Sequence, residues 1–215
     1  MRTLKRITAI ILIISCACCL AACKKKEAVN PGLILDAKPV IYLYPEVTTD
    51  VAVWLDYSGE LTCTYPAYAD GWRITAEPDG TLTDGAGQTY NYLYWEGVSD
   101  TVYDLSEGFC IAGADTAAFL EDALNRLGLT RREANEFIVY WLPLMQENPY
   151  NLISFQSDSY TQSAQLRIDP APDTLIRVFM AFKPLESAVE VPAQELSCAP
   201  RTGFTAVEWG GCEVR

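Results

Sequence analysis

"TTDVAVWLDYSGELTCTYP", residues 48–66, alternates apolar and polar side chains on both sides of a central Ser-Gly. Alternation with a period of two is the pattern of a β-strand with one buried face, and Ser-Gly is typical of a turn. The stretch therefore predicts a β-hairpin. The buried face of its first strand is predicted to hold Val51, Val53, Leu55 and Tyr57.

Strand patterns extend outward from this hairpin in both directions. The first half of the chain continues as an antiparallel meander, because "PDG" (78–80) and "DGAG" (84–87) supply turns in which glycine adopts positive φ. A single strand is expected over 89–97, "TYNYLYWEG". The remaining predicted strands cover residues 38–45, 150–156, 164–169, 174–182 and 203–211.

Between the two groups of strands the apolar period changes to that of a helix. Residues 115–127 carry one apolar stripe, and Gly128 follows as a candidate C-cap. A second helix is predicted to start at Thr130 with Glu133 completing a capping box, to be buried nearly all round, and to kink or end at Pro143. We therefore expect an α+β fold, a sandwich-like antiparallel meander with an inserted helical hairpin.

The N-terminus has the pattern of an export signal. Arg2, Lys5 and Arg6 precede a run of apolar or small residues at 7–22 that is too short to span a membrane, which needs about 20 apolar residues. Cys23 and three lysines follow. The predicted organisation is a signal peptide at 1–22, a tether at 23–38 and one globular domain at 39–215.

The end of the signal, "LAAC" at 20–23, resembles the lipobox of bacterial lipoproteins. The resemblance implies that the Cys23 thiol carries a diacylglycerol and that the peptide is cut just before it. The alternative is an ordinary secreted protein with a chance cysteine. With the lipid, Cys23 anchors the protein to the membrane on the extracytoplasmic side, and Lys24, Lys25 and Lys26 lie near anionic headgroups.

Charge and composition exclude several functions. Removing 1–22 removes three basic residues, which leaves 13 basic against 28 acidic residues and a net charge of −15. Nucleic acid is therefore not an expected partner. The sequence contains no histidine, which excludes His-dependent triads and His-containing metal sites.

Four cysteines remain after the signal and Cys23: Cys63, Cys110, Cys198 and Cys212. Export permits disulfides, and Cys198 with Cys212 is the candidate pair that is closest in sequence. The alternative is that Cys63 and Cys110 are buried free thiols that act as small hydrophobic residues.

Several phrases along the chain are similar to those of a family of uncharacterised bacterial lipoproteins and secreted proteins. They run from Lys38 to Gly211. The resemblance implies a single domain located in the cell envelope. The phrases are "KPVIYLYP", "GW" followed by "AEPDGT", "YLYWEG", "YWLP", "RVFMAF" and "GFTAVEWGG".

Candidate site residues come from the strand at 89–97 and the C-terminal strand. Strand alternation places Tyr90, Tyr92, Tyr94 and Glu96 on one side, and we expect Glu96 and Glu208 both to emerge on an outward face. Three interpretations stay open. The face binds a glycan, peptide or protein partner; the two glutamates are the acid and base of a glycosidase; or the tyrosines pack and either Arg167 or Arg177 pairs with a glutamate.

Other chemistry has no support in the sequence. Asp79 and Asp84 lack the spacing of a calcium loop, so no metal ligands are predicted. Neither a nucleophilic serine motif nor a phosphate loop is present, and no cofactor is expected. The leading hypothesis is a lipid-anchored, non-enzymatic envelope protein with an aromatic and acidic binding face, and the alternative is a His-free carbohydrate-active enzyme using Glu96 and Glu208.

Overall fold

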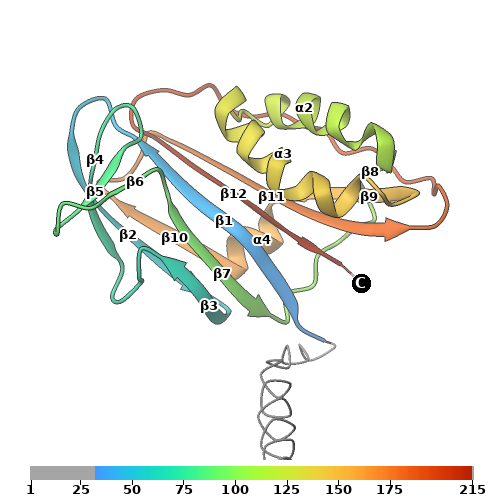
Figure 1. Cartoon of the computed structure of the whole chain (residues 1–215), viewed down its shortest axis with the longest axis horizontal. Helices are drawn as coiled ribbons and strands as arrows, with labels where there is room; N and C mark the ends of the chain where they lie inside the picture. The colour runs from blue at the N-terminus through green and yellow to red at the C-terminus, as the bar shows by residue number, and fades with distance from the viewer. Residues whose placement is uncertain (1–31, 215) are drawn as a thin grey trace, which may run out of the picture. The chain divides into compact units, whose positions relative to one another are not determined.

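The computed structural model describes residues 32–214, and the fold is α+β and dominated by two β-sheets (Figure 1). The seven-stranded sheet has the order β3 (Gly59–Tyr65), β7 (Leu93–Ser99), β1 (Ile34–Tyr44), β12 (Thr205–Glu213), β11 (Thr174–Leu185), β9 (Tyr150–Gln156) and β8 (Phe109–Ala112). The five-stranded sheet has the order β10 (Ala164–Asp169), β2 (Thr49–Tyr57), β4 (Trp72–Ala76), β5 (Leu82–Asp84) and β6 (Thr89–Tyr90). The helices are η1 (Gly113–Asp115), α2 (Thr116–Arg126), α3 (Arg131–Met145) and α4 (Asp158–Ser163).

The stretch at 48–66 forms two strands, but they belong to different sheets. β2 pairs with β10 and β4, whereas β3 pairs with β7 at the edge of the seven-stranded sheet. The predicted hairpin is therefore wrong. Between the strands, the Ser58 N–H donates to the Ser163 carbonyl at 2.7 Å, where the chain passes from one sheet to the other. The predicted buried face of β2 is confirmed for Val51, Val53 and Leu55.

The centre of the seven-stranded sheet joins segments that are far apart in the sequence. β1 pairs antiparallel with both β7 and β12, while β12 runs parallel to β11. The expectation of a wholly antiparallel sheet is wrong for this last pair. A parallel pair needs a long crossover, which residues 186–204 provide.

Both faces of the seven-stranded sheet are covered, one by the five-stranded sheet and the other by α2 and α3 (Figure 1). β12 is consequently buried along nearly its whole length. The core between the sheets includes Ile41, Leu93, Trp95, Phe179 and Ala206 from the larger sheet and Val53, Trp72 and Ile74 from the smaller. The core under the helices includes Tyr42, Val207, Trp209, Met180, Leu124, Phe137 and Trp141.

The helix boundaries follow the predicted capping chemistry. The Glu133 N–H donates to Thr130 Oγ1 and the Thr130 N–H donates to Glu133 Oε2, which confirms the capping box. Gly128 adopts φ +87° just after α2, as a C-terminal glycine does. α3 runs past Pro143 as far as Met145. Its buried face is narrower than predicted, because the side chain of Leu144 is half exposed.

The folded domain starts earlier than predicted. The tether was expected to reach residue 38, but β1 begins at Ile34 and the Asp36 side chain is completely buried. Between Asp36 and Val40, β1 has one residue more than each of its neighbours β7 and β12, which shifts the register of both pairs. Lys38, within this bulge, adopts φ 61°. This bulge reverses the alternation, so that Asp36 points toward the core between the sheets while Lys38 reaches tyrosines on the helix-covered face.

Candidate functional site

The predicted strand at 89–97 is interrupted, which separates its tyrosines. β6 ends at Tyr90 in the five-stranded sheet, and β7 begins at Leu93 in the seven-stranded sheet. Placing Tyr90 on one strand face with Tyr92 and Tyr94 is therefore wrong. Tyr92 and Tyr94 do lie on the same side, where they pack against the core under the helices.

Glu208 is completely buried between the two sheets, so the prediction that it faces outward is wrong. Its carboxylate accepts hydrogen bonds from Trp95 Nε1 at 3.2 Å and from Arg177 Nε at 2.7 Å. Trp95 points into the core between the sheets, so its strand neighbour Glu96 points the opposite way. Glu96 and Glu208 thus lie on opposite faces of one sheet and cannot flank a sugar together, which removes the geometric basis of the glycosidase hypothesis.

Three tyrosines, one of them missed by the sequence reasoning, line an open cavity of about 410 Å³ that we call the tyrosine pocket. The side chain of Tyr65, at the end of β3, is 61% exposed, and its ring lies edge-on to Tyr90 with centroids 5.4 Å apart. The Tyr90 hydroxyl donates to Asp84 Oδ2 at 2.8 Å, which fixes its ring. The complete lining is Tyr65, Thr81, Thr89, Tyr90, Asn91 and Tyr92.

A second cavity of about 270 Å³ adjoins the tyrosine pocket, because Thr81 and Asn91 line both. Gly80 makes the close approach of the β4–β5 turn to β1 feasible: a β-carbon there would lie 2.6 Å from the Tyr44 ring. The other lining residues are Tyr42, Tyr44, Asp79 and Arg132. This cavity is more polar than the tyrosine pocket and extends it toward α3.

Tyr92 also lies close to the bulge of β1. The Lys38 ammonium lies 5.1 Å from the ring centroids of Tyr92 and Tyr94 and 5.9 Å from that of Tyr140 in α3. The Lys38 backbone N–H donates to Glu96 Oε1 at 3.2 Å. Burial, together with a hydrogen bond to Glu96, raises the pKa of Tyr94, which keeps the phenol protonated. We call Lys38, Tyr92, Tyr94, Glu96 and Tyr140 the Lys38 cage.

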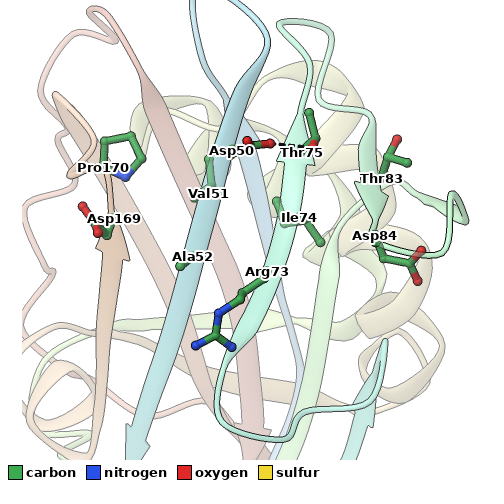
Figure 2. A pocket seen from close by; sticks show the side chains of 11 residues that line it. Asp50, Val51, Ala52, Arg73, Ile74, Thr75, Thr83, Asp84, Asp169 and Pro170 are labelled. Atoms are coloured by element: carbon green, nitrogen blue, oxygen red, sulfur yellow. Dashed lines mark hydrogen bonds between the residues drawn. The ribbon is translucent and has the colours of Figure 1, made fainter.

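The outer face of the five-stranded sheet carries another concavity, of about 450 Å³ (Figure 2). Its walls hold Asp50, Asp84, Asp169 and Arg73, and no aromatic ring lines it. Asp50 Oδ1 accepts from the Thr75 hydroxyl at 2.7 Å, and Asp84 Oδ1 accepts from backbone N–H groups of its own turn. Two of its three carboxylates are thus already engaged in holding the sheet and its turn.

A buried polar cluster lies between the sheets and is centred on Asp36, a residue that the predicted tether at 23–38 contained. Asp36 accepts hydrogen bonds from Tyr57 at 2.7 Å and Tyr103 at 2.8 Å. Burial raises the pKa of Asp36 to about 6, with a smaller contribution from the Glu208 charge, while the two tyrosines oppose the rise. No pocket described above reaches this cluster, so its role is in the core.

The cysteines of the described domain are free thiols, and the predicted Cys198–Cys212 disulfide is absent. Cys198 is exposed and sits against Gly128 near Ile176, whereas Cys212 is buried between the sheets beside Ala181 of β11. Positions 176 and 181 are separated along β11 by roughly 16 Å at about 3.3 Å per residue. A disulfide needs α-carbons within about 7 Å, so Cys198, near Ile176, and Cys212, beside Ala181, lie too far apart to pair.

Within residues 32–214, no helix is long and apolar enough to cross a membrane. The same range holds no cluster of three or more Cys, Asp or Glu side chains arranged to bind a metal ion. Cys23 lies outside the described residues.

Comparison with known proteins gives one informative match. No family model and no solved structure matches the chain. A Butyrivibrio fibrisolvens protein named "Uncharacterized protein in bglA 3'region" is 54% identical over 65 residues, which cover 29% of this chain and 67% of the relative. The chain belongs to the same family as this Butyrivibrio fibrisolvens protein.

Proposed function

We propose that the protein is a lipid-anchored binding module of the bacterial cell envelope, and that it binds a glycan in the tyrosine pocket. The observation that carries this proposal is the lining of that pocket, where three tyrosines are combined with uncharged hydrogen-bonding side chains. Tyrosine rings are flat and amphipathic, so they can stack on a sugar ring while the hydroxyl stays hydrated.

The chemistry of the lining supports a sugar more than a peptide or a hydrophobic ligand. Asn91, Thr81 and Thr89 offer amide and hydroxyl groups that can both donate to and accept from sugar hydroxyls. The volume of about 410 Å³ is within the usual range of about 300–1,000 Å³ for small-ligand sites. The adjoining cavity provides room for a second sugar unit in the direction of Arg132.

The proposal is for binding and not for catalysis. Among its described lining residues, the tyrosine pocket holds neither a pair of carboxylates nor a nucleophile beside a base. The only carboxylate of the adjoining cavity is Asp79, whose Oδ1 accepts the Thr81 N–H at 2.8 Å within the β4–β5 turn.

The membrane anchor is part of the same proposal and rests on the resemblance of "LAAC" to a lipobox. Residues 24–33 separate Cys23 from β1, and a chain of ten residues spans at most about 35 Å. The start of β1 would therefore stay within about 35 Å of the membrane that holds the lipid. Mass spectrometry of the protein from its native membrane should show a diacylglyceryl adduct on Cys23, and a Cys23→Ser variant released into the medium unlipidated is the control. An unmodified Cys23 would contradict the anchor.

Glycan binding is tested on the chain that lacks residues 1–22 and carries Cys23→Ser. An oligosaccharide array identifies a ligand, and calorimetric titration then compares the wild-type domain with Tyr65→Ala and Tyr92→Ala. Tyr65 is the sharper test because its exposed ring contributes little to the core. We expect at least about a tenfold loss of affinity, equivalent to about 1.4 kcal/mol.

The matched control is Tyr150→Ala, a half-buried tyrosine on β9, four strands away from β7 in the same sheet. It should bind the ligand as the wild type does. Unchanged binding in Tyr65→Ala and Tyr92→Ala, with unfolding temperatures showing intact folds, would contradict the proposal.

A further inference from the structure

We propose that the Lys38 ammonium is an anion subsite beside the tyrosine pocket, so that the bound glycan carries an acidic substituent, either a carboxylate or a sulfate or phosphate ester. This inference rests on the proposed function, because it names the chemical class of the ligand at the same site. It starts from the way β1 presents Lys38.

The backbone at Lys38 is held in an unusual conformation. Lys38 is the only residue other than glycine with positive φ in the described chain, at 61°. L-residues avoid this region at a cost, and such outliers and β-bulges concentrate near functional sites. The bulge is fixed from both sides, since Glu96 accepts the Lys38 N–H and Pro39 packs against Gly210 of β12. The fold therefore maintains a strained residue whose side chain reaches the tyrosines.

The ammonium group has no hydrogen-bond acceptor from the described protein. It lies over the rings of Tyr92 and Tyr94 and near that of Tyr140, yet it forms no ion pair and donates no hydrogen bond within residues 32–214. The Glu96 carboxylate accepts the Lys38 backbone N–H instead. The three N–H donors of an ammonium held over aromatic faces are available to an oxygen anion.

The tyrosine pocket and the Lys38 cage share one residue, Tyr92. Its side chain lines the pocket, and its ring lies 5.1 Å from the ammonium. A charged group that extends from a sugar in the pocket past the Tyr92 ring would come near the Lys38 ammonium. Of the neighbouring arginines, Arg201 is paired with buried Glu133, and Arg132 lies 3.9 Å from Glu136 in an exposed ion pair.

The charge of the whole protein limits how acidic the ligand can be. With a net charge of −15 after removal of residues 1–22, the body repels polyanions. A single ammonium in such a field selects one negative group at one position. The expected ligand is therefore a glycan with an isolated acidic unit, and not a uniformly charged polymer.

The test uses oligosaccharides of equal length that differ in one unit: a uronate, its methyl ester, and a sulfated analogue of the ester. Calorimetric titration at low salt measures the affinity ratio of each acid to the ester. The wild type should prefer an acid by about tenfold, and this preference should shrink with added salt. Whichever of the uronate and the sulfated analogue has the larger affinity ratio to the ester identifies the preferred anion.

Lys38→Met keeps the apolar length of the side chain and removes the charge, so the ratio should fall to about one. Lys38→Arg should retain a preference, and Arg126→Met, an exposed cation on α2, should leave it unchanged. If Lys38→Met does not fold, the salt dependence and Lys38→Arg still decide the question. Equal wild-type affinities for the acid and the ester would overturn the anion subsite. If that binding still depended on Tyr65, the proposed glycan binding would stand. If neither oligosaccharide bound, the anion subsite and the proposed function would both be overturned.

Discussion

Asp36 gives the sharpest physical test of the core between the sheets. Burial raises its pKa from 3.8 to about 6, so the folded protein holds the proton more tightly than the unfolded chain does. A difference of about 2 pKa units corresponds to about 3 kcal/mol, at about 1.36 kcal/mol per unit. The free energy of unfolding should therefore fall by about this amount as pH rises from below 3.8 to above 6, most steeply between these two values, and this contribution should level off above about pH 7.

The assay is urea unfolding of the wild type and Asp36→Asn from pH 3.5 to 8. The difference between the two proteins isolates Asp36 from the other carboxylates. The asparagine side chain of the variant cannot ionise, so the wild type should lose stability relative to the variant by about 3 kcal/mol over the assay range, with most of the loss between pH 4 and 6. The offset between the curves also contains any change in the hydrogen bonds to Tyr57 and Tyr103, but that part does not depend on pH in this range. A difference that is flat with pH, or that has the opposite slope, would refute the reasoning.

Two further predictions concern the buried ion pair and the thiols. Glu208→Gln should destabilise the fold by about 3–5 kcal/mol because it leaves the Arg177 charge without its counterion, and a loss below about 1 kcal/mol by chemical denaturation would contradict this. The double variant Glu208→Leu with Arg177→Met should lose less than Glu208→Gln alone. In the native protein, Cys198 should react rapidly with a thiol reagent, whereas Cys212 should react only on unfolding, because it is buried and burial raises its thiol pKa. A native mass lower by two hydrogens would instead reveal a disulfide.

The local elements of the fold could be predicted from the sequence, because their signals are local. The patterns at 150–156 and 164–169 give β9 and β10 with the same bounds, and the capping box at Thr130 is present. Strand partners could not be predicted. Alternation tells which side chains share a face but carries no information on the neighbouring strand, so β3 was placed beside β2 and the parallel β11–β12 pair was missed.

The candidate site shows the same limit. Alternation correctly predicts that Glu208 and Trp209 lie on opposite faces of β12. The prediction that Glu208 faces outward is wrong, because both faces of the seven-stranded sheet are covered at β12. Lys38 was missed because a single inserted residue in β1 reverses the alternation. Tyr65 was missed because its contact with Tyr90 joins two sheets. Tyr92 was the one predicted residue that belongs to both the pocket and the cage.

The most direct measurement for the central claim is a crystal structure of the domain with an oligosaccharide identified on the array. The account predicts a sugar ring in contact with Tyr65, Tyr90 or Tyr92, with its hydroxyls hydrogen-bonded to Asn91 or Thr81. A sugar bound instead in the concavity on the outer face of the five-stranded sheet (Figure 2), with the tyrosine pocket empty, would contradict it.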